Sequence, residues 1–214
     1  MKSVLILGIG EFGGTIAKRM SELNCDVLAV DSNEERINEI LPYVTSAKIG
    51  DCSNRELLES FGVRNFDVCV VAVGGLFQTS LETTCTLKEL GAEFVMARAT
   101  NDVQMKFLKM AGADEVAYPE KQTAIRYATK YASDTILDFI QLDDRYSIYE
   151  MKVPRNWYGK TLIQIDVRKK FNINIITMKR DGEVFIPMAD TKMMPEDVAF
   201  VIGEIKDVFK CFKI

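Results

Sequence analysis

The stretch that decides the fold is Val4-Leu5-Ile6-Leu7-Gly8-Ile9-Gly10-Glu11-Phe12-Gly13-Gly14. It predicts a short apolar strand, a glycine turn and the start of a helix that continues to Met20. In this spacing Gly8 permits the tight turn, Gly10 lets a phosphate approach the backbone, and Gly13 lets the helix pack closely on the strand. The N–H groups and the positive dipole end of that helix attract an anion. The stretch therefore predicts a phosphate-binding turn.

A carboxylate follows the next apolar strand, where a nucleotide-binding βαβ unit requires one. Val27-Leu28-Ala29-Val30 ends in Asp31, twenty-three residues after Gly8. An acid at this distance accepts hydrogen bonds from a ribose. Together the two features favour a nucleotide site over a glycine-rich turn that binds nothing.

The composition indicates a globular protein and disfavours several kinds of partner. Hydrophobic residues make up 48% and charged residues 27% of the chain, which is ordinary for a soluble protein. A net charge of −4 argues against a basic nucleic-acid-binding surface. No apolar run is long enough to span a bilayer, and we expect a cytoplasmic protein without a signal peptide. The five cysteines contain no C-x-x-C pair, and we expect buried, reduced thiols.

The sequence contains no histidine. This removes Ser-His-Asp and Cys-His nucleophiles, the usual zinc ligands and the commonest general base. No tyrosine has a lysine four positions on, so the Tyr-x-x-x-Lys arrangement of many nicotinamide-dependent reductases is also missing. These absences disfavour catalysis and we expect a protein that is not an enzyme, with Asp, Glu or Lys chemistry as the alternative.

Apolar strands and helical segments alternate as far as residue 132, which predicts a Rossmann-like, doubly wound parallel sheet. Its ligand crevice lies beyond the carboxyl ends of the strands. By position alone, the candidate site consists of the glycine loop, Asp31, Asp51, Cys52, Val73, Gly74, Arg98 and Glu120.

The pattern changes at Thr135, where apolar residues at 136, 137, 139, 140 and 142 predict a helix. This helix either packs back on its own sheet or crosses over to a second lobe or a neighbouring subunit. Asp143 and Asp144 then form a linker. Beyond it, alternating strands, a hairpin turn at 180–182 and a final helix over 205–212 predict a small α+β lobe. We expect an N-terminal domain over 1–134, a crossover helix and linker over 135–143, and a C-terminal domain over 144–214 that dimerises.

The order of these parts resembles one protein family nearly from end to end. The resemblance is carried by the glycine loop, by the strand that ends in an acidic residue with the helix after it, and by several short motifs. These are Val30-Asp31-Ser32-Asn33-Glu34-Glu35, Gly50-Asp51, Arg64-Asn65-Phe66-Asp67, Gly112-Ala113-Asp114, Pro119-Glu120-Lys121 and Asp166-Val167-Arg168. The chain resembles the regulatory subunits of Trk/Ktr-type potassium-uptake systems, which contain an N-terminal and a C-terminal RCK (regulator of potassium conductance) domain.

The resemblance implies a cytoplasmic gating subunit without catalytic activity. Homodimers would assemble into a ring, an octamer, at the inner face of the cell membrane beneath a potassium-conducting membrane subunit. Nucleotide bound in the N-terminal domain, ATP or ADP, would set the shape of that ring.

The resemblance also implies roles for individual residues. The phosphates would meet Gly10, Phe12 and Gly13, Asp31 would take the ribose, and Asp51 with Cys52 would lie beside the adenine. The predicted cofactor-binding set is completed by Gly8, Glu11, Ser32, Val73, Gly74 and Arg98. Arg98 falls where relatives often carry a lysine near the phosphates. Glu120 falls where relatives place a carboxylate that holds a divalent cation, Mg²⁺ or Ca²⁺. The alternative for Glu120 is a cap of the helix that follows it.

Glu11 departs from the family pattern, since many Ktr-type sequences carry an arginine there. A carboxylate beside a triphosphate repels it unless a cation intervenes. This departure puts discrimination of ATP from ADP in doubt and leaves NAD(H) or AMP as alternative ligands. Glu11 alternatively serves as a solvated acid that stabilises the helix dipole.

Six residues of the C-terminal domain resemble positions that bind cyclic di-AMP in some relatives: Ile163, Asp166, Arg168, Asn174, Ile175 and Pro187. The alternative is a purely structural dimer interface. For the whole protein, the alternative function is a small NAD-dependent dehydrogenase with the C-terminal lobe as its substrate domain.

Overall fold

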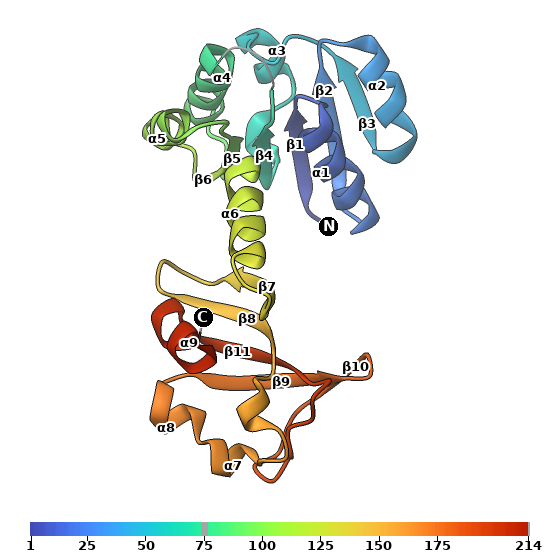
Figure 1. The fold of residues 1–214 in the computed structure, drawn as a ribbon. Helices are drawn as coiled ribbons and strands as arrows, with labels where there is room; N and C mark the ends of the chain where they lie inside the picture. The colour runs from blue at the N-terminus through green and yellow to red at the C-terminus, as the bar shows by residue number, and fades with distance from the viewer. Residues whose placement is uncertain (74–76, 214) are drawn as a thin grey trace. The chain divides into compact units, whose positions relative to one another are not determined.

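The computed structural model describes residues 1–73 and 77–213. The chain divides into two compact units, Met1–Lys121 and Gln122–Ile214 (Figure 1). Among the described residues, no helix is both long and apolar enough to cross a membrane.

The first unit is built on a parallel sheet of six strands in the order β3-β2-β1-β4-β5-β6. The strands are β1 (Ser3–Leu7), β2 (Asp26–Asp31), β3 (Ser46–Ile49), β4 (Val68–Val71), β5 (Val95–Arg98) and β6 (Glu115–Ala117). The chain moves outward from β1 to β3 and then returns to the other side of β1 at β4. This reversal between β1 and β4 is the topological switch point at which such sheets bind ligands.

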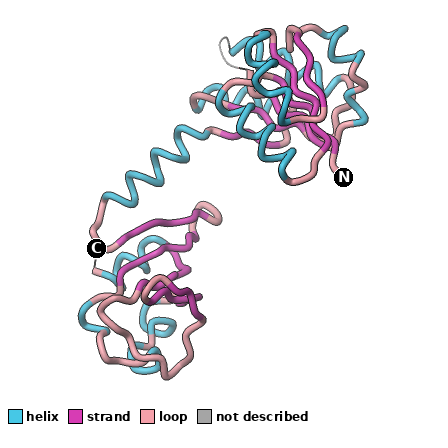
Figure 2. Tube along the Cα trace, turned by 90° about the vertical axis from the view of Figure 1, so that its right-hand side faces the viewer, coloured by secondary structure: helices cyan, strands magenta, loops and turns pink. Residues whose placement is uncertain are grey.

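Helices cover both faces of this sheet, so the predicted doubly wound fold is confirmed (Figure 2). They are α1 (Glu11–Glu22), α2 (Glu34–Ile40), α3 (Arg55–Ser60), α4 (Phe77–Glu89) and α5 (Asp102–Met110), with short 3-10 turns η1 (Leu41–Tyr43) and η2 (Val63–Asn65). Alternate residues of β1 enter different cores: Ile6 packs with α1 and α2, and Leu5 packs in the core that α3, α4 and α5 cover. Both side chains are fully buried, and each contributes about 1.5–3 kcal/mol through burial.

The second unit is built on an antiparallel sheet of five strands in the order β10-β9-β11-β8-β7. The strands are β7 (Ile136–Gln141), β8 (Tyr146–Lys152), β9 (Asn174–Arg180), β10 (Glu183–Phe185) and β11 (Val198–Glu204). Its helical segments are η3 (Arg155–Trp157), α7 (Leu162–Ile165), α8 (Val167–Phe171) and α9 (Ile205–Phe212). The predicted small α+β lobe is therefore confirmed, with a core in which the Trp157 and Phe212 rings lie 5.2 Å apart.

The prediction of a crossover helix over 135–143 is wrong, because Ile136–Gln141 forms strand β7. This strand pairs with β8, and the ring of Phe139 stacks on that of Tyr149 at 5.8 Å. Apolar residues on both faces of this segment are compatible with a buried strand as well as with a helix, so the pattern alone did not decide between them. The helix that precedes this strand is α6 (Pro119–Tyr131), with Pro119 at its first position.

The helical segment 162–171 is divided into α7 and α8 at Asp166. This residue has φ 52° and ψ 51°, the left-handed conformation that ends one helix, and α8 begins directly after it. Asp166 is thus a corner between α7 and α8, and its two neighbours, Ile165 and Val167, are both buried in the core of the second unit.

Candidate functional site

The three glycines of the loop differ in what an added side chain would meet. Gly8 has φ +94°, and a Cβ on Gly13 would lie 1.9 Å from the carbonyl oxygen of Gly8. A side chain is therefore excluded at Gly13 by the contact between α1 and the turn itself. A Cβ on Gly10, in contrast, would meet nothing within 4 Å. The space beside Gly10 is open, which fits a ligand that approaches the backbone.

Helix α1 begins at Gly10 without a side-chain cap. The first turns of α2, α3 and α5 are each capped by an asparagine, at positions 33, 54 and 101. The first intrahelical bond of α1 is donated by the Gly14 N–H to the Gly10 carbonyl at 2.7 Å. Among the described residues, the N–H groups of Glu11, Phe12 and Gly13 have no acceptor within the chain, so they can bind an anion, which the helix dipole favours there.

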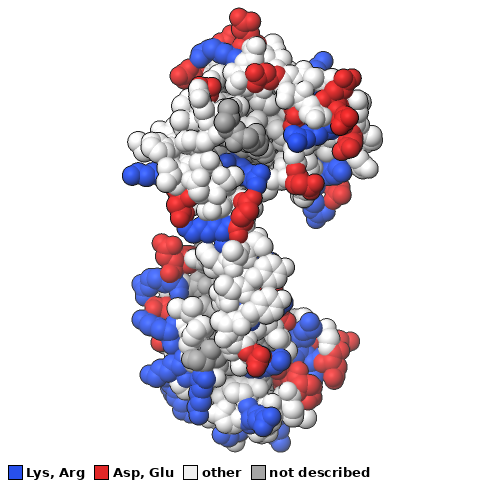
Figure 3. Space-filling model, turned by 45° about the horizontal axis from the view of Figure 1, so that its top comes forward, with Lys and Arg blue, Asp and Glu red and all other residues white. Residues whose placement is uncertain are grey.

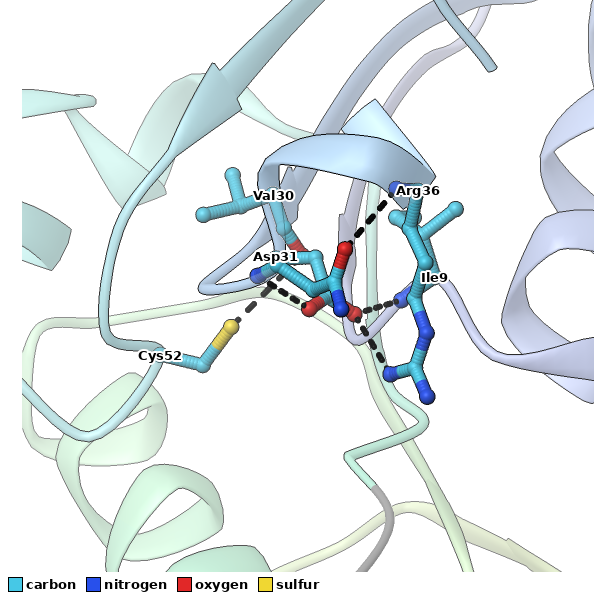
Figure 4. Close-up of polar contacts among 6 residues, drawn as sticks. Ile9, Val30, Asp31, Arg36 and Cys52 are labelled. Atoms are coloured by element: carbon cyan, nitrogen blue, oxygen red, sulfur yellow. Dashed lines mark hydrogen bonds and ion pairs between the residues drawn. The ribbon is translucent and has the colours of Figure 1, made fainter. Parts of the chain in front are cut away.

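Asp31 lies at the end of β2 with only 5% of its surface exposed. One carboxylate oxygen accepts from the Ile9 N–H at 2.7 Å, and the other accepts from the Asn33 N–H at 2.8 Å (Figure 4). The Arg36 guanidinium lies 3.5 Å from the oxygen that Ile9 contacts. Asp31 is thus held in one orientation by the glycine loop and by α2, and each of its oxygens has remaining acceptor capacity for a ribose hydroxyl.

The loop after β3 holds the residues that we predicted beside the adenine. The Cys52 thiol is buried and donates to the Val30 carbonyl at 3.6 Å, and burial raises its pKa to about 12. The Asp51 carboxylate accepts from the Ser53 N–H at 2.9 Å and from the Ser53 hydroxyl at 2.7 Å, which lowers the pKa of Asp51. The Cys52 thiol is therefore neutral and unreactive at physiological pH. The Asp51 carboxylate stabilises the turn that contains Ser53.

The remaining predicted residues on this side differ in exposure. Ser32 is exposed and Val73 is half-buried. Val73 lies against the loop, since its backbone nitrogen would be 2.6 Å from a Cβ on Gly8. Gly74 lies outside the described residues.

Arg98 and Glu120, which we predicted separately, form an ion pair with each other. Arg98 is the last residue of β5 and Glu120 the second residue of α6. The Arg98 guanidinium carbon also lies 5.7 Å from the centroid of the Phe12 ring, in the first turn of α1. The pKa of Glu120 lies below its usual range because its own backbone N–H and the Arg98 guanidinium donate to its carboxylate. The structure thus brings together Arg98, Glu120 and the glycine loop.

The described residues contain no cluster of His, Cys, Asp and Glu with metal-ligand geometry. An ion at Glu120 would therefore take one carboxylate oxygen from this chain and most of its ligands from phosphate and water. Metal binding by Glu120 stays a prediction.

Sequence reasoning missed Arg36 and Lys18. Both line a cavity of about 280 Å³ between α1 and α2, beside Gly10 and Glu11. Helix side chains lean toward the helix N-terminus, so an arginine in the first turn of α2 points to the end of β2. That rule, applied to the helix after Asp31, would have found Arg36.

Local cations matter because the first unit is acidic overall. Residues 1–121 contain twelve Lys and Arg against eighteen Asp and Glu, whereas residues 122–214 contain fifteen against thirteen. Figure 3 shows acidic and basic side chains interspersed over the first unit. A phosphate would therefore be held by the N–H groups of α1 and nearby cations, not by a general positive field.

In the second unit, five of the six residues predicted for a second ligand line one cavity of about 300 Å³. They are Ile163, Asp166, Arg168, Asn174 and Ile175, with Leu162, Val167 and Ala189 completing the lining. The Arg168 guanidinium donates to the Asn174 side-chain oxygen at 2.7 Å. Pro187 is half-buried and is not among the lining residues.

Comparison with known proteins identifies relatives of both units. The model of the TrkA-N domain matches residues 4–119 and that of the TrkA-C domain matches residues 148–212. The Ktr system potassium uptake protein C of Bacillus subtilis (strain 168) is 38% identical over 208 residues, which cover 97% of this chain and 94% of the relative. Protein A of the Ktr system in the same organism is 34% identical, with the same coverage of 97% and 94%.

Among solved structures, the one described as the GsuK channel bound to NAD has a TM-score of 0.69 at 18% identity. The match covers 96% of this chain and 38% of that chain. This likeness supports the fold of both units.

Proposed function

Because this chain belongs to the family of Ktr and Trk potassium-uptake proteins with TrkA-N and TrkA-C domains, we propose that it is a regulatory subunit controlled by an adenine nucleotide. The nucleotide binds at the glycine loop of the first unit and changes the conductance of a membrane potassium-transport subunit. The resemblance seen in the sequence is confirmed at the level of the family.

One observation carries the nucleotide site: the open space at Gly10 adjoins both the uncapped start of α1 and the fixed carboxylate of Asp31. Gly10 has room for a phosphate, α1 offers free N–H groups, and Asp31 is oriented by the loop. Phosphate and ribose are joined in a nucleotide at the spacing that such a loop and strand end accept.

ATP or ADP is the proposed ligand, with NAD(H) and AMP as alternatives. The GsuK channel, a distant structural neighbour with the same fold, is described as bound to NAD. Glu11 is exposed in the first turn of α1, where a carboxylate disfavours a γ-phosphate more than an α- or β-phosphate. We therefore propose that ADP or a dinucleotide binds at least as well as ATP.

A regulatory role fits the side chains at the site better than a catalytic one. The chain has no histidine, and the Cys52 thiol has its pKa raised to about 12 by burial. Among the described residues around the loop, Asp31 and the first N–H groups of α1 are placed to bind and orient a ligand. The competing function, a small NAD-dependent dehydrogenase, would lack both a histidine and a Tyr-x-x-x-Lys arrangement.

The proposed partner is a Ktr- or Trk-type membrane subunit, because the relatives are parts of potassium-uptake systems. We place this chain in the cytosol, as a homo-oligomeric ring that contacts that subunit. The second unit would contribute a second ligand site for cyclic di-AMP, which is supported by the gathering of five predicted residues around one cavity.

Calorimetry on the purified full chain tests the nucleotide site, with ATP, ADP, AMP and NAD as ligands and Gly10→Ala as the matched variant. We expect binding of at least one of these ligands by the wild type and its loss in the variant. Absence of binding for all of them would refute the proposal. Steady consumption of NADH with a panel of carbonyl substrates would favour the dehydrogenase instead.

A further inference from the structure

The ion pair between Arg98 and Glu120 joins the nucleotide side of the first unit to the start of α6. Arg98 closes β5, and Glu120 lies in the first turn of a helix that runs to Tyr131. The boundary between the compact units falls inside this helix, after Lys121. A change at Glu120 therefore acts on a helix whose later residues belong to the second unit.

Arg98 also faces the loop where the phosphate would bind. Its guanidinium lies 5.7 Å from the Phe12 ring, and Phe12 is the second residue of α1. Within the described part of the chain, the buried Nε of Arg98 has no hydrogen-bond partner. A guanidinium carries five N–H donors, so the ion pair with Glu120 does not use all the donors of this arginine.

We propose that Glu120 competes with the ligand's phosphate for Arg98, so that a phosphate-bearing ligand releases Glu120 and loosens the first turn of α6. This inference rests on the proposed nucleotide site. A phosphate offers more charge and more acceptor oxygens than a carboxylate and binds arginine in a bidentate manner. The Glu120 side chain is 54% exposed, and exposed ion pairs are weak enough to be displaced.

A second ion pair lies in the same turn of α6. The Lys121 ammonium lies 2.5 Å from the Asp102 carboxylate, at the start of α5. This pair lies on the neighbouring residue but does not involve Arg98 or the glycine loop. It is therefore the natural control.

The competition makes the phosphate, and not the adenine, the group that α6 senses. ADP and NAD carry phosphates that reach the start of α1, whereas adenosine carries none. Adenosine can occupy Asp31 and the adenine side of the site without disturbing Glu120.

Hydrogen–deuterium exchange on the full chain, with calorimetry in parallel, tests this inference. In the wild type, ADP or NAD should raise amide exchange in the peptide that covers 120–126, and adenosine should not. In Glu120→Gln, exchange in this peptide should be raised without ligand and unchanged by ADP. The same variant should bind ADP about two- to fivefold more tightly, since an exposed competing pair is removed.

Two further variants complete the test. Arg98→Gln should bind ADP no better than adenosine, and Asp102→Asn should keep the wild-type response of 120–126 to ADP. Circular dichroism checks that each variant is folded. If a variant does not fold, the comparison of ADP with adenosine on the wild type still tests the inference.

The outcomes separate the inference from the proposed function. ADP binding without a change in exchange at 120–126, or an unchanged ADP affinity in Glu120→Gln, would overturn the inference and leave the nucleotide site standing. If neither ADP nor NAD binds to the wild type, both the inference and the proposed nucleotide site are refuted.

Discussion

The carboxylate of Asp31 accepts a hydrogen bond from the backbone N–H of Ile9 at 2.7 Å. The acid at the end of β2 is thus bonded to the glycine loop. A residue that the sequence suggests only for ribose binding also fixes the loop that would hold the phosphate. Loss of Asp31 should consequently affect both the ligand and the folded chain.

We predict that Asp31→Ala weakens binding of an adenine nucleotide by about 1–3 kcal/mol and also lowers the melting temperature, because the Ile9 and Asn33 N–H groups lose their acceptor. Calorimetry and thermal unfolding measure the two effects. Asp26→Ala is the control, since Asp26 is exposed at the other end of the same strand. Equal affinities in Asp31→Ala and the control would contradict the proposed ribose contact.

Alanine at Gly10 and at Gly13 should have opposite effects. A Cβ on Gly10 meets nothing within 4 Å, so we expect stability within about 0.5 kcal/mol of the wild type but a loss of nucleotide binding. A Cβ on Gly13 would collide with the Gly8 carbonyl at 1.9 Å, and we expect destabilisation of at least about 1–3 kcal/mol. Denaturant unfolding and calorimetry distinguish them. A stable Gly13→Ala protein would show that α1 can move away from the turn.

Glu11→Arg should raise the preference for ATP over ADP. The exposed carboxylate in the first turn of α1 would be replaced by a cation that can reach a terminal phosphate. The ratio of the two dissociation constants, measured without divalent ions, checks this. Glu11→Gln separates removal of the negative charge from addition of a positive one. An unchanged ratio in both variants would assign Glu11 to the solvent side of α1.

A divalent cation should strengthen nucleotide binding if Glu120 is one of its ligands. We predict that added Mg²⁺ or Ca²⁺ raises the affinity of the wild type and that Glu120→Gln abolishes this rise, because the carboxylate and the phosphates would share the ion. Titrations with and without the ion measure the difference. If affinity is indifferent to both ions, Glu120 acts only through Arg98 and its own helix.

The ion pair between Arg126 and Asp138 should make the stability of the second unit depend on pH. The Arg126 guanidinium donates to Asp138 and holds the pKa of that carboxyl below its usual value. The contribution is therefore present above the pKa of the unfolded chain, about 4, and is lost as the pH falls through the lower folded value. Asp138→Asn should accordingly melt below the wild type at neutral pH. The difference should vanish in acid, and a difference that stays constant would refute this origin.

The sequence predicted where the candidate residues of the first unit lie but not how they contact one another. Asp31, Arg98 and Glu120 were placed by their positions in or after strands, which the parallel topology brings to the same edge of the sheet. Their bonds to Ile9 and to each other depend on distances across the sheet. We treated Arg98 and Glu120 separately, although they follow neighbouring strands and carry opposite charges.

Strand β7 shows why local pattern was insufficient in the second unit. Its apolar residues satisfy a helical face as well as a buried strand, so propensity alone leaves the choice open. The choice is made by β8, whose Tyr149 stacks on Phe139. Strand β8 lies next to β7 in the sequence. The contact between Phe139 and Tyr149 depends on the register in which the two strands pair, and this register is seen only in the folded chain.

The contact between Gly13 and Gly8 bears on how glycine motifs are used to infer function. Backbone geometry requires these two glycines, so a stable chain needs them whether or not the loop binds a ligand. Gly10 alone has no such steric obligation. A homologue with a larger residue at that position should keep the fold but lose the space for a phosphate. The middle glycine is therefore the position of the motif that best indicates ligand binding.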